Sequence, residues 1–313
     1  MARHLTHRLI ISVPVLFGVL LIGFLLLQVV PTDPAIVAAG PSATQEEVQA
    51  IRQALGLDQP IWYQFLIYIG RVLMFDLGRS IISNRPVIEE LALTIGPTVE
   101  LMVATLIWAV PLGIALGTLA ATKRGSLFDR AVMAVSVAGV SMPIFFIALL
   151  MIQWQASLPN PLPFQGRAGP LWTLEGWRHI LLPAITLGAV FVGPCARITR
   201  TAVLEVLGSD FVRTARAKGA AEPRVVVRHA LRNALIPVVT LVGLQIGFLM
   251  GGAVVTETIF AWPGVGRLAV GAISSSDFPT AQGAILMLAT GFIVINLIVD
   301  LLYAVLDPRV GRR

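Results

Sequence analysis

The sequence predicts an all-α membrane protein, a polytopic bundle of transmembrane helices. Of its 313 residues, 56% are hydrophobic and only 13% are charged, whereas soluble domains carry about 25% charged residues. The apolar residues are gathered into blocks long enough to cross a hydrocarbon core, which needs about 20 residues per helix. The one cysteine, Cys195, lies in such a block and allows no internal disulfide. Together these observations exclude an ordinary soluble enzyme.

Six apolar blocks meet this length, and each is bounded by charged residues or by proline and glycine. They run over residues 9–30, 99–121, 131–154, 181–199, 235–256 and 281–306. The first block is too long for the core of a signal peptide, and no small-residue cleavage pattern follows it, so we expect a retained helix. Pro111, Pro143 and Pro237 fall inside three of the blocks and predict kinks there.

The distribution of positive charge predicts the orientation of the bundle. If the six blocks all cross the membrane, 16 of the 23 Lys and Arg residues fall in segments on the side of the N-terminus. Cytoplasmic segments retain positive charge, so this side is predicted to be cytoplasmic and both termini lie there. The net charge of +6 therefore reflects topology rather than nucleic-acid binding.

Two hydrophilic segments are large enough to form structure of their own. The external one follows the first block and gives an N-terminal division, residues 1–98, of one span plus an external subdomain. Within it, the run after Ser42 is typical of a helix start, and Trp62 to Tyr68 suits a helix along the outer interface. Residues 99–313 form the predicted core of five spans, with a cytoplasmic loop at about 200–234.

Groups that could do chemistry are scarce. The sequence has no phosphate-binding Gly-x-x-x-x-Gly-Lys-Ser/Thr loop, so any ATP must be hydrolysed by a partner. Its four histidines show no metal-ligand spacing, and we expect neither a metal nor a cofactor on this chain.

Three acidic residues, Glu100, Glu257 and Asp300, fall inside predicted spans, where charge is unfavourable and often functional. Glu100 and Glu257 lie near outer helix ends, where interface solvation or capping explains them equally well. Asp300 shares a helical face with Asn296, which suits a hydrogen bond between helices or, less simply, a place on a substrate pathway.

The cytoplasmic loop is predicted to fold as helix, break, helix. Ser209 or Asp210 can cap the first helix, Gly219 suits a left-handed position at its end, and Pro223 suits the first turn of the next helix. A short helix projected into the cytoplasm could act as a lever. Its basic residues could equally keep the loop inside the cell or touch anionic lipid.

This loop resembles the coupling motif of the inner-membrane permeases of ATP-binding-cassette importers, in their dipeptide, oligopeptide and nickel branch. The residues that carry the resemblance are Arg213, Thr214, Ala215, Arg216, Ala217, Lys218 and Gly219. The general motif is Glu-Ala-Ala-x-x-x-Gly, so Arg213 and Thr214 depart from it in the way the peptide branch typically does. Further matches are Pro31 to Ala35, Leu55 to Pro60, Phe75 to Ser80, Glu257 to Arg267 and Asp300 to Arg309.

The resemblance implies a type I importer permease in a bacterial inner membrane, a transport subunit rather than an enzyme. The implied partners are a second, distinct permease, two cytoplasmic ATPases that bind ATP and Mg, and an extracytoplasmic solute-binding protein. Residues 213–219 with Pro223 would then sit in a groove of one ATPase. The long external segment resembles the larger-loop permease of the pair.

The resemblance makes di- and oligopeptides the leading substrates, with nickel chelates, glutathione or sugars as alternatives. A secondary transporter driven by an ion gradient is a rival of another class, but it would favour membrane-embedded ionisable residues and inverted repeats. A membrane enzyme or scaffold is a second rival, for which the sequence offers no catalytic constellation.

Overall fold

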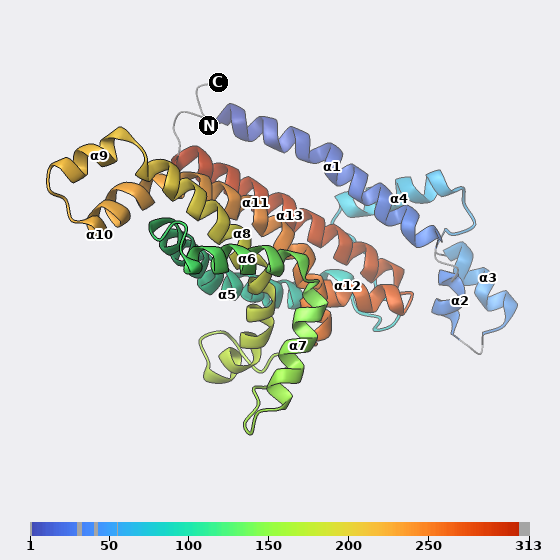
Figure 1. The fold of residues 1–313 in the computed structure, drawn as a ribbon. Coiled ribbons are helices and arrows are strands. Elements are labelled where there is room, and N and C mark those ends of the chain that lie inside the picture. Colours follow the sequence, from blue (N-terminus) through green and yellow to red (C-terminus); the bar gives the residue numbers. More distant parts are fainter. Residues whose placement is uncertain (1, 30–32, 41–42, 55, 307–313) are drawn as a thin grey trace. The chain divides into compact units, whose positions relative to one another are not determined.

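The computed structural model describes residues 2–29, 33–40, 43–54 and 56–306, and these are almost entirely helical (Figure 1). No β-strand forms among the described residues beyond an isolated bridge between Arg79 and Pro86. The elements in chain order are α1 (Ala2–Val29), α2 (Pro34–Ala39), α3 (Gln45–Ala54), α4 (Ile61–Leu73), α5 (Val87–Thr122), α6 (Leu127–Ser141), α7 (Ile144–Ala156), α8 (Leu174–Leu207), α9 (Asp210–Ala217), α10 (Glu222–Arg224), the π-helical η1 (Val225–Leu231), α11 (Arg232–Ile259), α12 (Val265–Ser274) and α13 (Phe278–Leu306).

Within the described residues, four helices are long and apolar enough to cross a membrane, or five if a bent pair counts as one span. The four segments are Val87–Thr122, Leu174–Leu207, Pro237–Ile259 and Phe278–Val299. The first predicted span falls on α1, whose described apolar stretch, Ile10–Leu25, is shorter than a span. The count of six spans and the cytoplasmic termini therefore stay predictions.

The predicted span over residues 131–154 is not a single helix, because the chain breaks there into α6 and α7 with a bend of 107°, at the proline where the sequence allowed a kink. The break falls at Met142 and Pro143. Proline has no N–H to donate and disfavours the helical conformation of the residue before it. Met142 accordingly takes extended angles, φ −85° and ψ 125°, and Pro143 becomes the N-cap of α7.

The helix α5 is longer than the predicted span, because it begins at Val87 instead of residue 99. Its 36 residues correspond to about 54 Å at 1.5 Å per residue, which exceeds the hydrocarbon thickness of about 30 Å. Glu89 and Glu90 lie in its first turn, where carboxylates favour a helix start. These early turns were predicted to be part of the external loop.

The described chain forms two compact units, of which the first comprises Val99–Phe260 and the chain from Ile295 onward. In this unit α8 is the central helix, with 67% of its apolar window buried. Glycines let its neighbours come close. A Cβ on Gly117 of α5 would lie 2.3 Å from the carbonyl oxygen of Ala196, and one on Gly193 of α8 would lie 2.7 Å from that of Ser136 on α6.

The second unit comprises Ala2–Thr98 and Ala261–Val294. Its core joins Val87 and Leu91 of α5 to Val265 and Ala269 of α12 and Ala284 of α13. Buried hydrogen bonds reinforce this core, as Trp262 Nε1 donates to the Pro97 carbonyl at 2.8 Å and the Val265 N–H donates to Thr98 Oγ1 at 2.9 Å.

The buried Asp277 joins two distant segments of the chain within the second unit. Its carboxylate accepts from Ser80 Oγ at 2.5 Å, from the Ile81 N–H at 3.0 Å and from Thr280 Oγ1 at 2.8 Å. The loop that ends in Ser80 is thereby tied to the junction of α12 and α13. The same unit contains the predicted external helices, since α3 and α4 cover the segments expected after Ser42 and around Trp62 to Tyr68.

Candidate coupling hairpin

The predicted coupling residues lie at the tip of a helical hairpin. Figure 1 shows α9 and α10 at this tip, with α8 and α11 as its two legs. The chain leaves α8 at Gly208, turns at Ser209, and forms α9 over Asp210–Ala217. The predicted sequence of helix, break and helix is confirmed.

The turn after α9 is closed by backbone hydrogen bonds around Gly219. Lys218 N–H donates to the Thr214 carbonyl at 3.0 Å, and Ala220 N–H donates to the Ala215 carbonyl at 3.2 Å. Gly219 has φ +82°, the left-handed conformation expected from its position after the helix. No atom lies within 4 Å of a Cβ built on Gly219, so the constraint there is conformational rather than steric.

The next helix, α10, has Pro223 in its first turn as predicted, but a π-helical turn that was not predicted follows it. Pro223 lies in the first turn of α10, where its missing N–H has no intrahelical partner to lose. The chain then widens into η1 before α11 begins. This π-helical turn was not predicted. Ser209 is the N-cap of α9, but its hydroxyl donates to the Val206 carbonyl at 2.5 Å instead of capping α9.

Small apolar side chains hold the two legs of the hairpin together. Ala202 and Val203 of α8 form a buried cluster with Ala121 of α5, Ala230 of η1 and Ala234 of α11. At the tip, α9 packs against η1, and Val212 is fully buried. A displacement of α9 would therefore be passed to the legs through packed contacts rather than absorbed by a loose loop.

The outer surface of α9 is exposed and mostly basic. Phe211 is 48% exposed although Val212 beside it is buried, so the helix presents Phe211, Thr214 and Lys218 on its free side. Arg213 is also exposed and makes only a 3.4 Å contact with Asp210. An exposed aromatic ring among cations is typical of a surface that binds another protein.

One bidentate ion pair connects α9 to α10. Arg216 donates to Glu222 through Nη2 at 2.6 Å and through Nε at 3.0 Å. The Arg216 guanidinium lowers the pKa of Glu222 below its ordinary value of 4.5. The pair spans the Gly219 turn, and both of its side chains are exposed.

A second bidentate pair lies at the base of the hairpin. Arg200 of α8 donates to Asp129 of α6 through Nε at 2.5 Å and through Nη2 at 2.7 Å. The Gly125 N–H also donates to this carboxylate, at 2.9 Å. Asp129 is almost fully buried. The pair ties α8, just before it enters the hairpin, to the first turn of α6.

The polar residues of the spans lie apart from this hairpin in the sequence. Glu257 is fully buried in the last turn of α11, and Asn296 is half-buried in α13. Asp300 belongs to α13, but its side chain lies outside the described part of the structure. Glu100 forms a bidentate pair with Arg167, at 2.7 and 2.8 Å, so it has a specific partner beyond interface solvation.

Sequence reasoning missed Asp129, Arg167 and Asp277. A local signal existed for Asp129, because Ser126-x-x-Asp129 is the pattern of a capping box, and the Asp129 N–H does donate to Ser126 Oγ at 3.2 Å. Arg167 and Asp277 find partners 67 and 197 residues away, and no local pattern predicts those. Among the described residues, no cluster of three or more His, Cys, Asp or Glu could hold a metal ion.

The long apolar helices are those of a membrane protein, and comparison with known proteins identifies its family. Residues 113–312 match the inner membrane component of binding-protein-dependent transport systems, and residues 1–94 match the N-terminal part of that membrane component. The chain therefore belongs to this family of multi-pass inner-membrane permeases.

Its relatives include glutathione permeases. The chain is 43% identical over 310 residues, 99% of either chain, to the glutathione transport system permease protein GsiC of Escherichia coli strain K12. The same identity and coverage hold for GsiC of Escherichia coli O6:H1 strain CFT073 and of Shigella dysenteriae serotype 1. The resemblance to the peptide, nickel and glutathione permeases is thereby confirmed.

Proposed function

We propose that this chain is the permease subunit of an ATP-driven importer of short peptides, a class that includes the tripeptide glutathione. The observation that carries the proposal is the full-length identity of 43% to glutathione permeases. The partners would be a second permease, two cytoplasmic ATPases that hold ATP and Mg, and an extracytoplasmic binding protein. The chain itself would catalyse no reaction.

The hairpin supports a coupling role for residues 213–219 and Pro223. Closure of the ATPase pair on binding ATP would push on α9. The exposed side chains of Phe211 and Lys218 would contact the ATPase there. The Gly219 turn and the packed legs of the hairpin would make the tip stiff enough to move the spans. Alternating access then follows as a rigid-body motion of helices driven from one side of the membrane.

The residues of the pathway itself are a weaker part of the proposal. Glu257 and Asn296 are polar groups within spans, and such groups often mark a pathway or a contact between helices. Glu257 is fully buried, which favours a role between helices over direct contact with cargo.

The test is ATP-dependent uptake in proteoliposomes. The vesicles contain this chain with its co-purified partners. The binding protein is added outside the vesicles, and ATP is enclosed inside them, on the side of the ATPase subunits. Labelled glutathione and a labelled dipeptide are supplied in parallel, and an ATPase partner with a dead catalytic site is the control. We expect uptake of at least one peptide that the dead ATPase abolishes.

Two outcomes would contradict the proposal in different ways. Uptake that continues with the dead ATPase and follows an ion gradient would make the chain a secondary transporter. Failure of both peptides, while the binding protein still stimulates ATP hydrolysis, would keep the importer and reject peptides in favour of chelates or sugars.

A further inference from the structure

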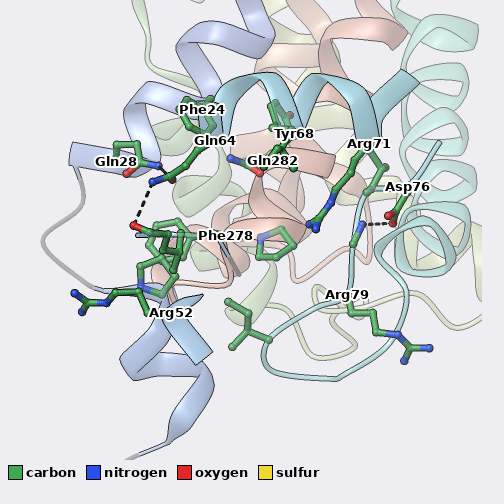
Figure 2. A pocket seen from close by; sticks show the side chains of 18 of the residues that line it. Phe24, Gln28, Arg52, Gln64, Tyr68, Arg71, Asp76, Arg79, Phe278 and Gln282 are labelled. Carbon is green, nitrogen blue, oxygen red and sulfur yellow. Dashed lines mark hydrogen bonds between the residues drawn. The ribbon is translucent and has the colours of Figure 1, made fainter. Parts of the chain in front are cut away.

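The second unit contains a cavity that the proposed coupling function does not use. It has a volume of about 680 Å³ and lies between the end of α1, α3, α4, the loop 76–81 and the start of α13 (Figure 2). Sites for small organic ligands commonly have volumes of about 300–1,000 Å³. All of its lining residues belong to the second compact unit.

Arg71, an exposed residue of α4, points into this cavity, and its guanidinium has no partner among the described residues. Figure 2 shows the Arg71 side chain reaching from α4 into the middle of the cavity, whereas the guanidinium groups of Arg52 and Arg79 point away from it. Arg52 pairs with Asp33, and Arg79 Nη1 donates to the Asn84 carbonyl at 2.9 Å. No ion pair or hydrogen bond joins the Arg71 guanidinium to any residue in the described ranges.

The nearby negative charges are already engaged by other groups. Asp33 faces Arg52, and Asp76 Oδ1 accepts from the Gly78 N–H at 2.9 Å. Arg52 also keeps its Nε buried without an acceptor among the described residues. With three arginines against two aspartates, the cavity wall carries one excess positive charge as well as hydrogen-bond donors, which is the environment that an anionic group requires.

The remaining walls suit an organic ligand rather than a bare ion. The rings of Phe24 and Tyr68 stack at 5.9 Å between centroids, and Phe278 lines the cavity as well. Burial raises the pKa of Tyr68 to about 12, so its phenol is neutral at physiological pH. Gln282 adds a carboxamide that is hydrogen-bonded to none of the described residues, and an amide of this kind can both donate to and accept from a ligand.

We propose that this cavity binds a small organic anion, with one carboxylate or phosphate group at Arg71 and a partly apolar body along Phe24, Tyr68 and Phe278. Two sources could supply this chemistry. One is a short peptide on its way to the pathway, and this source rests on the proposed function. The other is the headgroup of an anionic phospholipid, which does not.

The test is equilibrium binding to the full chain, assembled with its partner subunits in nanodiscs, without ATP and without binding protein. Tritiated glutathione is measured in phosphatidylcholine nanodiscs. Retention of phosphatidylglycerol is measured separately, by mass spectrometry of lipid that stays with the protein in detergent. The variants are Arg71→Gln, Arg71→Lys and the matched control Arg85→Gln, an exposed arginine of the same unit outside the cavity.

The expected result is a loss of about tenfold or more in the binding of one probe in Arg71→Gln, because a charge-assisted hydrogen bond is removed. Arg71→Lys should retain most of that binding, and Arg85→Gln all of it. Arg71 has no internal partner to lose among the described residues, so Arg71→Gln should fold. Should its elution profile change, Gln282→Leu replaces it as the test variant and should weaken the same probe.

The proposal is overturned if neither probe distinguishes Arg71→Gln from the wild type, or if Arg85→Gln weakens binding equally. Glutathione binding that depends on Arg71 assigns the site to cargo, and phosphatidylglycerol retention that depends on Arg71 assigns it to lipid. The binding assay contains no ATP and measures no transport. Both binding results can therefore be interpreted even if the separate test of ATP-dependent uptake fails.

Discussion

Two buried aspartates hold two regions of the molecule in different ways. Asp129, at the base of the coupling hairpin, faces the guanidinium of Arg200. Asp277, in the second unit, is reached among the described residues by neutral donors, namely two hydroxyl groups and one backbone N–H. The hairpin base therefore depends on charge compensation, whereas the second unit depends on the number of hydrogen bonds.

The comparison is tested most strongly at Arg200. Arg200→Leu leaves the buried carboxylate of Asp129 without its counter-charge, and breaking one partner of a buried pair is more harmful than removing both. We expect this variant to have the lowest unfolding temperature of the set, measured by thermal denaturation in detergent. Arg197→Leu, an exposed arginine on the same helix, is the control. Equal melting of the two variants would show that the ion pair contributes nothing.

Asp277 should respond to loss of hydrogen bonds rather than loss of charge. Asp277→Ala leaves a buried N–H and two hydroxyl groups without an acceptor, which should lower the free energy of unfolding by about 2 kcal/mol. Asp277→Asn keeps an acceptor for the Ile81 N–H, and Thr280 Oγ1 can accept from its amide, so its loss should be smaller. Denaturant titration of both variants measures this. An equal loss in the two variants would mean that the charge matters after all, because both of them remove it.

Gly219 tests whether the hairpin tip must be stiff. Valine resists the left-handed conformation that Gly219 adopts, by about 1–2 kcal/mol, so Gly219→Val should loosen the turn and uncouple uptake from ATP hydrolysis in proteoliposomes. Ala221→Val is the control, since Ala221 has extended angles, φ −61° and ψ 142°, that valine accepts. Normal coupling in Gly219→Val would remove the tip from the mechanism.

The smallest effect is expected at the exposed pair of Arg216 and Glu222. The pKa of Glu222 is lowered in the folded hairpin, so the pair favours the hairpin above pH 4.5 and this contribution disappears as the pH falls through the lowered pKa. In a chain labelled with carboxyl ¹³C-glutamate, Arg216→Gln should raise the titration midpoint of Glu222. Arg213→Gln should leave it unchanged, because Arg213 contacts Asp210. A midpoint insensitive to Arg216 contradicts the pairing.

The sequence predicted the hairpin well because its signals are local. The end of α9 follows from Gly219, and the start of α10 follows from Pro223. The sharp bend at Pro143 was only partly predicted. A proline allows a kink, but the angle of 107° depends on how α6 and α7 pack.

The tertiary contacts could not be predicted in the same way. The partners of Asp277 and Arg167 come from distant parts of the chain, and the cavity around Arg71 needs five separate segments to form its walls. The aromatic run of α4 was interpreted as an interface helix, which explains Trp62 on its exposed side but not the ring of Tyr68 inside. Such sites form only when distant segments of the chain fold together, so no periodic pattern in the sequence predicts them.

The unequal burial of α8 and α13 has a consequence for how this protein can evolve. Most of the apolar window of α8 is covered within the chain, but only 11% of that of α13 is. Exchange among leucine, isoleucine, valine and phenylalanine should therefore be tolerated along α13 and selected against along α8. Exposed positions of α13 that nonetheless refuse such exchange in a saturation mutagenesis screen would mark the surface that another subunit covers.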